Sequence, residues 1–174
     1  ERAPRSLWLR GRLIAADLHA LGINVNCTPV ADIARPETHR FLRSRCYGTH
    51  AAEVASHARA LAEGQAAGGV LPVLKHIPGH GRATADSHRA LPTVATDRAS
   101  LAAEDFAPFR ALADLPMGMT AHIVYTELDA ERPATLSPDA IAAIRDEIGF
   151  RGLLMTDDIS MEALAGPIAA RGAA

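Results

Sequence analysis

The sequence predicts an α/β fold in which parallel strands are connected by helices. Helix-like and strand-like segments alternate along the 174 residues, and this alternation is typical of parallel sheets with helical crossovers. Unusual polar residues follow the strand-like segments, where open α/β sheets and barrels both place their active sites. These observations leave two architectures open, a doubly wound sheet and part of a (β/α)8 barrel, because a whole barrel needs about 200 residues or more.

The first half of the chain contains two predicted helices and two predicted strands. Residues 7–21 have one apolar face and end at a glycine, which predicts a helix. Residues 23–30, INVNCTPV, form an apolar run closed by proline and predict a strand. An irregular stretch rich in Arg and Pro follows, and Thr49 is the predicted N-cap of a helix over residues 49–64. The second strand is predicted within residues 68–77, GGVLPVLKHI.

The second half continues the alternation after a long connection. Proline and glycines interrupt residues 78–96, which we expect to form a loop. A helix is predicted to start at residue 97 or 100 and to run to 112, and MGMTAHIVY, residues 117–125, is the third strand. Ser137 followed by proline predicts the N-cap of the next helix. The fourth strand lies within residues 151–161, RGLLMTDDISM, and a further helix is predicted to begin at the end of that run.

Composition indicates one globular unit and excludes several partners. The chain is 48% hydrophobic with a net charge of -2, which predicts a buried core over residues 1–174 and argues against nucleic acid as a partner. No apolar run approaches the roughly 18 residues of a membrane helix. Cys27 and Cys46 form no CxxC pair, so they predict neither a metal framework nor a disulfide, and they favour a reducing compartment.

The most informative stretch is KHIPGHGRATADSHRALPTV, residues 75–94. Lys75 is the single lysine of a chain that otherwise uses arginine, which indicates a site that needs a compact ammonium. Three interpretations of the histidines compete. They are solvated loop residues, or His76, His80 and His88 bind zinc with Asp86, or Asp86 orients His88 as an acid/base.

The acid/base interpretation has a geometric basis. Residues two apart in an extended segment point the same way, so Asp86 could hold one nitrogen of His88 and leave the other free. Histidine titrates near neutrality, which suits a group that must act first as an acid and then as a base.

Two adjacent acids, Asp157 and Asp158, follow the fourth predicted strand. A carboxylate emerging there could attack the anomeric carbon of a sugar. A helix N-cap pair is the alternative, and strand alternation directs only one of the two acids toward a site. Arg45 and His122 also follow predicted strands, and His122 is equally consistent with a buried core histidine.

The segment from Lys75 to Val94 resembles the signature of family-3 glycoside hydrolases, in particular bacterial β-N-acetylglucosaminidases of cell-wall recycling. RCYGTH, GINVNCTPVADI, MGMTAHIVYTELDAERPATLS and GFRGLLMTDDISMEAL are similar to other segments of that family and occur in the expected order. The resemblance extends from about Leu7 to Leu164. It implies a partial (β/α)8 TIM-type barrel, with residues 1–174 as a single, incomplete catalytic domain.

The resemblance also implies an activity, which is the removal of terminal β-linked N-acetylglucosamine from a saccharide or muropeptide with retention of configuration. No metal or other cofactor, and a cytoplasmic location, are expected. The oligomeric state, and hydrolysis as against phosphorolysis, stay open. A metal-dependent hydrolase and an inactive piece of the barrel are the alternatives. The implied roles are Asp157 as nucleophile, His88 as acid/base, Asp86 as its carboxylate partner, and Arg45, Lys75 and His76 as sugar-binding residues.

One departure from the family pattern bears on Arg45. Cys46 and Tyr47 stand where Ser and Phe are usual, and the preceding stretch carries extra arginines. Two placements of Arg45 are therefore open, in the sugar pocket or displaced from it.

Overall fold

The computed structural model describes residues 2–85 and 90–164. Its centre is a four-stranded sheet whose strands are all parallel, in the order β1-β2-β4-β6. The chain therefore has the α/β fold with parallel strands that the sequence predicts. The strands are β1 (Val25–Asn26), β2 (Leu71–Ile77), β4 (Met117–Thr120) and β6 (Leu153–Met155).

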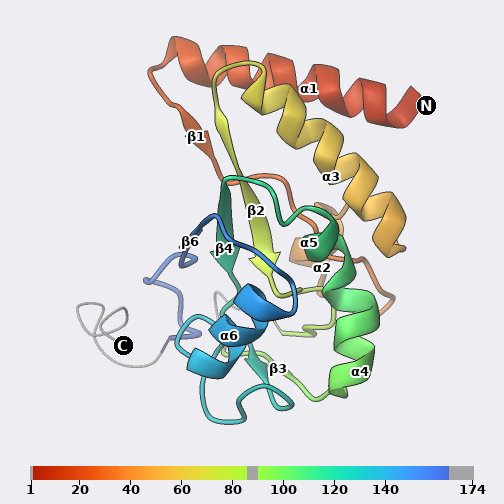
Figure 1. Ribbon diagram of the computed structural model, residues 1–174, viewed down its shortest axis with the longest axis vertical. Helices are drawn as coiled ribbons and strands as arrows, with labels where there is room; N and C mark the ends of the chain where they lie inside the picture. Colours follow the sequence, from red (N-terminus) through yellow and green to blue (C-terminus); the bar gives the residue numbers. More distant parts are fainter. Residues whose placement is uncertain (1, 86–89, 165–174) are drawn as a thin grey trace.

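Helices connect these strands and cover the sheet (Figure 1). Two long helices, α1 and α3, lie side by side near the amino-terminal ends of the first strands, and shorter helices pack lower on the sheet (Figure 1). A π-helical turn, residues 101–105, joins α4 to the segment before α5. The helices are α1 (Arg2–Ala20), α2 (Arg40–Arg43), α3 (Ala51–Ala66), α4 (Arg98–Ser100), α5 (Ala107–Ala111) and α6 (Pro138–Asp146).

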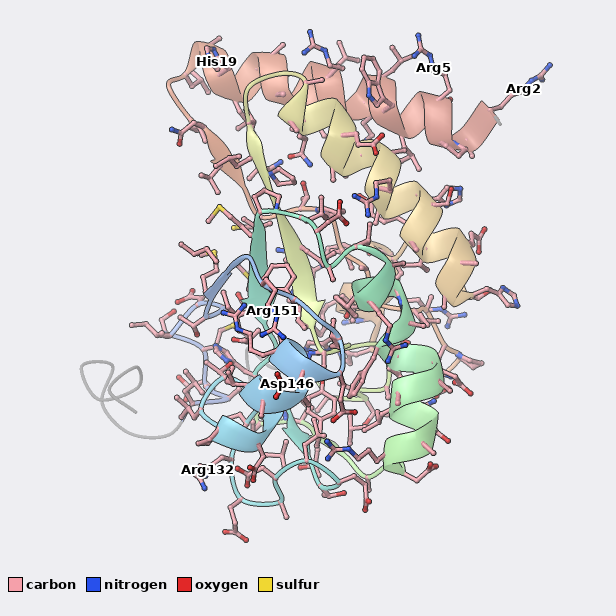
Figure 2. All side chains as sticks on the ribbon, in the orientation of Figure 1. Arg2, Arg5, His19, Arg132, Asp146 and Arg151 are labelled. Atoms are coloured by element: carbon pink, nitrogen blue, oxygen red, sulfur yellow. The ribbon has the colours of Figure 1, made fainter. Side chains whose placement is uncertain are left out.

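Glycines allow α1 and α3 to approach closely. A Cβ on Gly11 would meet the backbone of Leu61, and a Cβ on Gly64 would meet the carbonyl of Trp8. The opposite side of α1 is charged, and Figure 2 shows Arg2 and Arg5 pointing away from the body of the protein. The small residues at the contact explain why α1 buries little besides Gly11 and an alanine.

Helix ends follow the predicted capping residues in most places. Gly22 ends α1 with φ +77, a conformation that favours glycine. Ser137 caps α6 by accepting a hydrogen bond from the Ala140 N–H at 3.1 Å. The prediction for Thr49 is wrong, because His50 is the N-cap of α3. The Thr49 N–H instead donates to the Glu53 carboxylate at 3.3 Å.

The core fills the space between the sheet and the helices that follow it. Its largest members include three phenylalanines and a tyrosine, all nearly inaccessible, and aliphatic residues of β2 and α6 complete it. Ile144 of α6 and Ile148 just after it are buried, and Ile141 of α6 packs against the cluster. The buried aromatic residues are Phe106, Phe109, Phe150 and Tyr125.

The structure divides two segments that the sequence treats as uniform. The third predicted strand ends at Thr120, and a separate short strand, β5 (Val124–Tyr125), follows it. β5 pairs in parallel with β3 (Thr93–Val94), which lies inside the predicted 78–96 loop. That loop is therefore tied back to the body of the protein before it ends.

Two smaller differences concern helices. The sequence predicts that the Arg- and Pro-rich stretch is irregular, but it contains α2. The described residues after the last strand, 157–164, form turns where a helix is predicted to begin, and residues 165–174 lie outside the described residues. Within the described part of the chain, no helix has both the length and the apolar character that crossing a membrane requires.

Candidate active site

The carboxyl edge of the sheet gathers polar side chains from separate strands. Lys75 and His76 lie near the end of β2, His122 comes two residues after β4, and Asp157 comes two residues after β6. Parallel strands deliver these positions to the same edge, where α/β proteins bind their ligands. The edge is the candidate active site.

A buried carboxylate that the sequence analysis did not select, Asp32, lies beneath this edge. It is 0% exposed and accepts a hydrogen bond from Nδ1 of His76 at 2.7 Å and from the His80 N–H at 2.6 Å. The His76 N–H lies at a longer 3.4 Å from both carboxylate oxygens. Asp32 therefore joins the segment after β1 to the end of β2 and to the loop that follows.

The electrostatics of this cluster favour an ionised Asp32. Burial by itself raises the pKa of Asp32, but the attraction of His76 and His80 and their hydrogen bonds outweigh it, so the pKa is lowered. Burial, together with repulsion from His76, lowers the pKa of His80 to about 4. Near neutral pH, His80 is therefore an uncharged ring, packed edge-on against His76 with centroids 5.3 Å apart.

Asp157 faces the other side of the His76 ring. One carboxylate oxygen, Oδ2, lies 3.8 Å from Nε2 of His76, and the side chain is 23% exposed. The other oxygen accepts a hydrogen bond from the Asp158 N–H at 2.8 Å. The carboxylate is thus open to solvent on one side and oriented by the backbone on the other, as an attacking group must be.

The neighbouring acid has a different environment. Asp158 is exposed, and its Oδ1 accepts from the Ser160 N–H at 2.8 Å, which is a turn-capping contact. Its carbonyl lies 3.2 Å from Nε2 of His122. The carboxylate of Asp157 thus lies near His76, whereas that of Asp158 accepts a hydrogen bond within the turn.

His122 is a buried histidine that fixes this turn. It is 1% exposed, its Nδ1 lies 2.7 Å from the Thr135 hydroxyl, and its Nε2 contacts the Asp158 carbonyl. A carbonyl can only accept, so Nε2 carries a proton. Burial lowers the pKa of His122, and the neutral ring connects the end of β4 to the acidic turn.

Arg45 and Lys75 converge on one cavity of about 400 Å³. Arg45 is held over the Phe41 ring at 5.2 Å from its centroid, and its Nε donates to the Phe41 carbonyl at 3.1 Å. Phe41, on α2, also contacts His80 edge-on at 5.7 Å. The arginine-rich stretch therefore folds into α2 and keeps Arg45 beside the histidine cluster.

The two residues that depart from the family pattern also line this cavity, together with Cys27. Cys46 donates its thiol to the Leu42 carbonyl at 3.5 Å, and burial raises its pKa to about 12. It therefore behaves as a small, inert side chain. Asp157 is not among the described residues that line this cavity.

Asp86 and His88, the predicted acid/base pair, lie outside the described residues, which stop at 85 and resume at 90. Both flanks of that gap are fixed. On one side Tyr125 donates its hydroxyl to the Gly79 carbonyl at 2.8 Å, and on the other the Val124 N–H donates to the Pro92 carbonyl at 3.0 Å. The positions that bracket Asp86 and His88 are thus both attached to β5.

An ion-pair network adds a further attachment to the first flank. Nε of Arg82 lies 2.7 Å from the buried Asp105 carboxylate in the π-helical turn, and Arg35 contacts the same group at 3.3 Å. Glu104 bridges the two arginines at 2.7 and 2.8 Å. Burial is the largest influence on Asp105 and raises its pKa despite both arginines.

The zinc interpretation needs ligands that the described part of the chain supplies only in part. Within residues 2–85 and 90–164, no group of three or more His, Cys, Asp and Glu side chains has an arrangement that could hold a metal ion. Nδ1 of His76, one predicted ligand, is already bonded to Asp32. His88 and Asp86 would have to complete any such site.

Sequence reasoning passed over Asp32 because a lone acid in an apolar strand end has no recognisable motif. A usable signal existed, since a charged residue inside the apolar run PVADI is almost never buried without a partner. The partner, His76, is 44 positions away.

Comparison with known proteins places this arrangement in a family of sugar-cleaving enzymes. The chain matches the glycosyl hydrolase family 3 N terminal domain over residues 6–174. It therefore belongs to this family, and its parallel sheet is part of the family's (β/α)8 barrel. The fold and the family that the sequence predicts are both confirmed.

Individual relatives agree with this placement. The beta-hexosaminidase of Bordetella avium (strain 197N) is 37% identical over 169 residues, which cover 94% of this chain and 48% of that protein. NagZ from Neisseria gonorrhoeae, solved in complex with N-trifluoroacetyl-D-glucosamine, is 34% identical with a TM-score of 0.87, covering 98% of this chain and 50% of that one.

A third similar structure is the family 3 beta-N-acetylglucosaminidase from Paenibacillus sp. str. FPU-7. It is 35% identical with a TM-score of 0.86, and the match covers 90% of this chain and 31% of that one. The chain spans about half the length of the curated relatives it matches.

Proposed function

We propose that this chain carries the catalytic centre of a retaining glycoside hydrolase that removes terminal β-linked N-acetylglucosamine. Residues 1–174 would form part of a single catalytic domain. The observation that carries the proposal is the position of Asp157, a partly exposed carboxylate that follows β6 and faces His76 at the carboxyl edge of the sheet.

The sugar class is supported by the relatives and by the cations at the site. The Neisseria gonorrhoeae structure holds a glucosamine derivative, and an N-acetylglucosamine unit presents several hydroxyls to its binding site. Lys75 and Arg45, which line one cavity, would grip these hydroxyls through charge-assisted hydrogen bonds. His76 would contribute a further contact from Nε2, the nitrogen that Asp32 leaves free.

The reaction proceeds in two steps in this proposal. A carboxylate oxygen of Asp157 forms a bond to the anomeric carbon as the bond to the leaving oxygen breaks, and His88 gives that oxygen its proton. Neutral His88 then takes a proton from water, whose oxygen attacks the same carbon and releases Asp157. Asp86 would hold the imidazole of His88 in the orientation that both steps need.

A leaving-group comparison tests the acid role. We expect His88→Ala to impair cleavage of substrates with poor leaving groups far more than cleavage of activated aryl β-N-acetylglucosaminides, because only the former require protonation. His19→Ala is the matched control, since His19 lies at the far end of α1 (Figure 2). Equal losses on both substrate classes would argue against His88 as the acid.

Two alternatives remain outcomes of these assays. Because the chain covers about half of its curated relatives, each assay should be run on this chain and on a longer protein that contains it. Activity only in the longer protein would mean that this part alone is inactive. Phosphate that accelerates sugar release and appears as a sugar phosphate would indicate phosphorolysis. A muropeptide substrate and a cytoplasmic location belong to the same proposal.

A further inference from the structure

We propose that Asp32 is a positioning residue that keeps the proton of His76 on Nδ1 and so reserves Nε2 for the side of the site that Asp157 occupies. The idea rests on the proposed function, because it assigns a task to the same site.

The first step is the direction of the hydrogen bond between the two side chains. Asp32 is fully buried, and its Oδ2 lies 2.7 Å from Nδ1 of His76. The interactions with both histidines keep this carboxyl ionised, and an ionised carboxylate can only accept hydrogen bonds. Nδ1 must therefore carry the proton.

The second step concerns the other ring nitrogen. With Nδ1 bonded to Asp32, Nε2 is the ring nitrogen that remains for a partner on the other side of the ring. Nε2 lies 3.8 Å from Oδ2 of Asp157, a separation longer than a hydrogen bond. The ring therefore offers Nε2 to the part of the site where a sugar hydroxyl would approach.

More than one contact fixes the orientation of the Asp32 carboxylate. Its Oδ1 accepts from the His80 N–H at 2.6 Å, so the carboxylate cannot rotate without breaking that bond. Among the described residues, the ion-pair contact of Nδ1 is with Asp32 and that of Nε2 is with Asp157. The other ionisable groups near the pair come from separate elements. They are His80 and Asp157 next to His76, Cys46 and Tyr125 near Asp32, and His122 near Asp157.

An amide at this position would reverse the arrangement. In Asp32→Asn, the side-chain oxygen can take over the bond from the His80 N–H, which leaves the NH2 group facing Nδ1 of His76. An NH2 group donates, so Nδ1 must become an acceptor and the proton moves to Nε2. The wrong nitrogen would then be protonated toward the substrate.

The test is the tautomer of His76, read from imidazole nitrogen shifts in the histidine-labelled chain, with His76→Gln used for assignment. We expect the neutral ring to carry its proton on Nδ1 in the natural sequence. In Asp32→Asn we expect the proton on Nε2 and binding of N-acetylglucosamine weakened by about tenfold or more.

Asp105→Asn is the matched control, because Asp105 is also a buried carboxylate but contacts Arg35 and Arg82. It should leave the His76 tautomer unchanged. A neutral His76 ring with its single proton on Nε2 in the natural sequence would overturn the proposal even if Asp32→Asn does not fold. An unchanged tautomer in a folded Asp32→Asn would overturn it as well. The tautomer measurement needs no substrate, so its result stands even if the chain does not cleave N-acetylglucosamine.

Discussion

Exchanging each acid of the Asp157–Asp158 pair for its amide separates a nucleophile from a turn cap. Asp157→Asn preserves the shape of the side chain. It also keeps an oxygen that can accept from the Asp158 N–H, a hydrogen bond of 2.8 Å in the natural sequence. We therefore expect a change in unfolding free energy below about 1 kcal/mol. Sugar release should fall by roughly 10⁴-fold or more, because an amide cannot form the covalent intermediate.

Asp158→Asn is the control that the structure supplies. Its side chain is exposed and accepts from the Ser160 N–H, while the contact to His122 uses the backbone carbonyl. The substitution leaves both contacts in place, so we expect the rate of sugar release to fall by less than tenfold. A tenfold fall would correspond to about 1.4 kcal/mol in the activation free energy.

The assay is the release of the aryl group from an aryl β-N-acetylglucosaminide, with thermal unfolding to show that both variants are folded. A loss in Asp158→Asn as large as in Asp157→Asn would refute the assignment. Residual turnover above about 10% in Asp157→Asn would refute it equally.

Three further predictions concern stability and metal dependence. Burial lowers the pKa of His80 from 6.5 to about 4, so the unfolded chain binds this proton more readily than the folded chain does. The unfolding free energy should therefore fall by up to about 3 kcal/mol as the pH drops from 6.5 to about 4. Urea unfolding measures this change, and an unfolding free energy that does not vary over this pH range would contradict the lowered pKa of His80. Ser137→Ala removes the cap on the Ala140 N–H and should lower the unfolding free energy by about 1 kcal/mol; no change in the urea midpoint would show that the cap contributes nothing. Sugar release should be insensitive to a chelator, whereas loss restored by zinc would favour the metal-dependent alternative.

The fold was predictable because its signals are local or repeat along the chain. Apolar runs bounded by Gly and Pro located the four strands of the sheet, and Ser137 followed by proline located the start of α6. The capping error at Thr49 shows the limit of such signals. Thr49 and His50 are adjacent candidates, and His50 takes the N-cap position while the Thr49 N–H bonds to the Glu53 side chain.

Candidate site residues were predictable where a strand end supplied the placement. Lys75, His76 and Asp157 reach the same edge because parallel strands end there, and Arg45 joins Lys75 at one cavity. The roles of these residues, and the pairing of Asp86 with His88, stay predictions.

What the sequence could not predict depends on contacts between distant positions. Asp32 lies 44 residues from His76, and the pairing of β3 with β5 needs two segments of only two residues each to meet. Neither the Asp32–His76 contact nor the β3–β5 pairing leaves a periodic pattern in the sequence. In each case the partner comes near only when the chain folds. The same holds for α2, whose Phe41 is placed by contacts with Arg45 and His80.

The central claim is that the carboxylate of Asp157 bonds covalently to the sugar. A slowly turned-over fluorinated β-N-acetylglucosaminide with a good leaving group, followed by proteolysis and mass spectrometry, tests it most directly. We predict one added sugar on the peptide that contains Asp157, absent from Asp157→Asn and retained in Asp158→Asn. An adduct on another residue, or turnover of the reagent with no adduct at any time, would contradict the account.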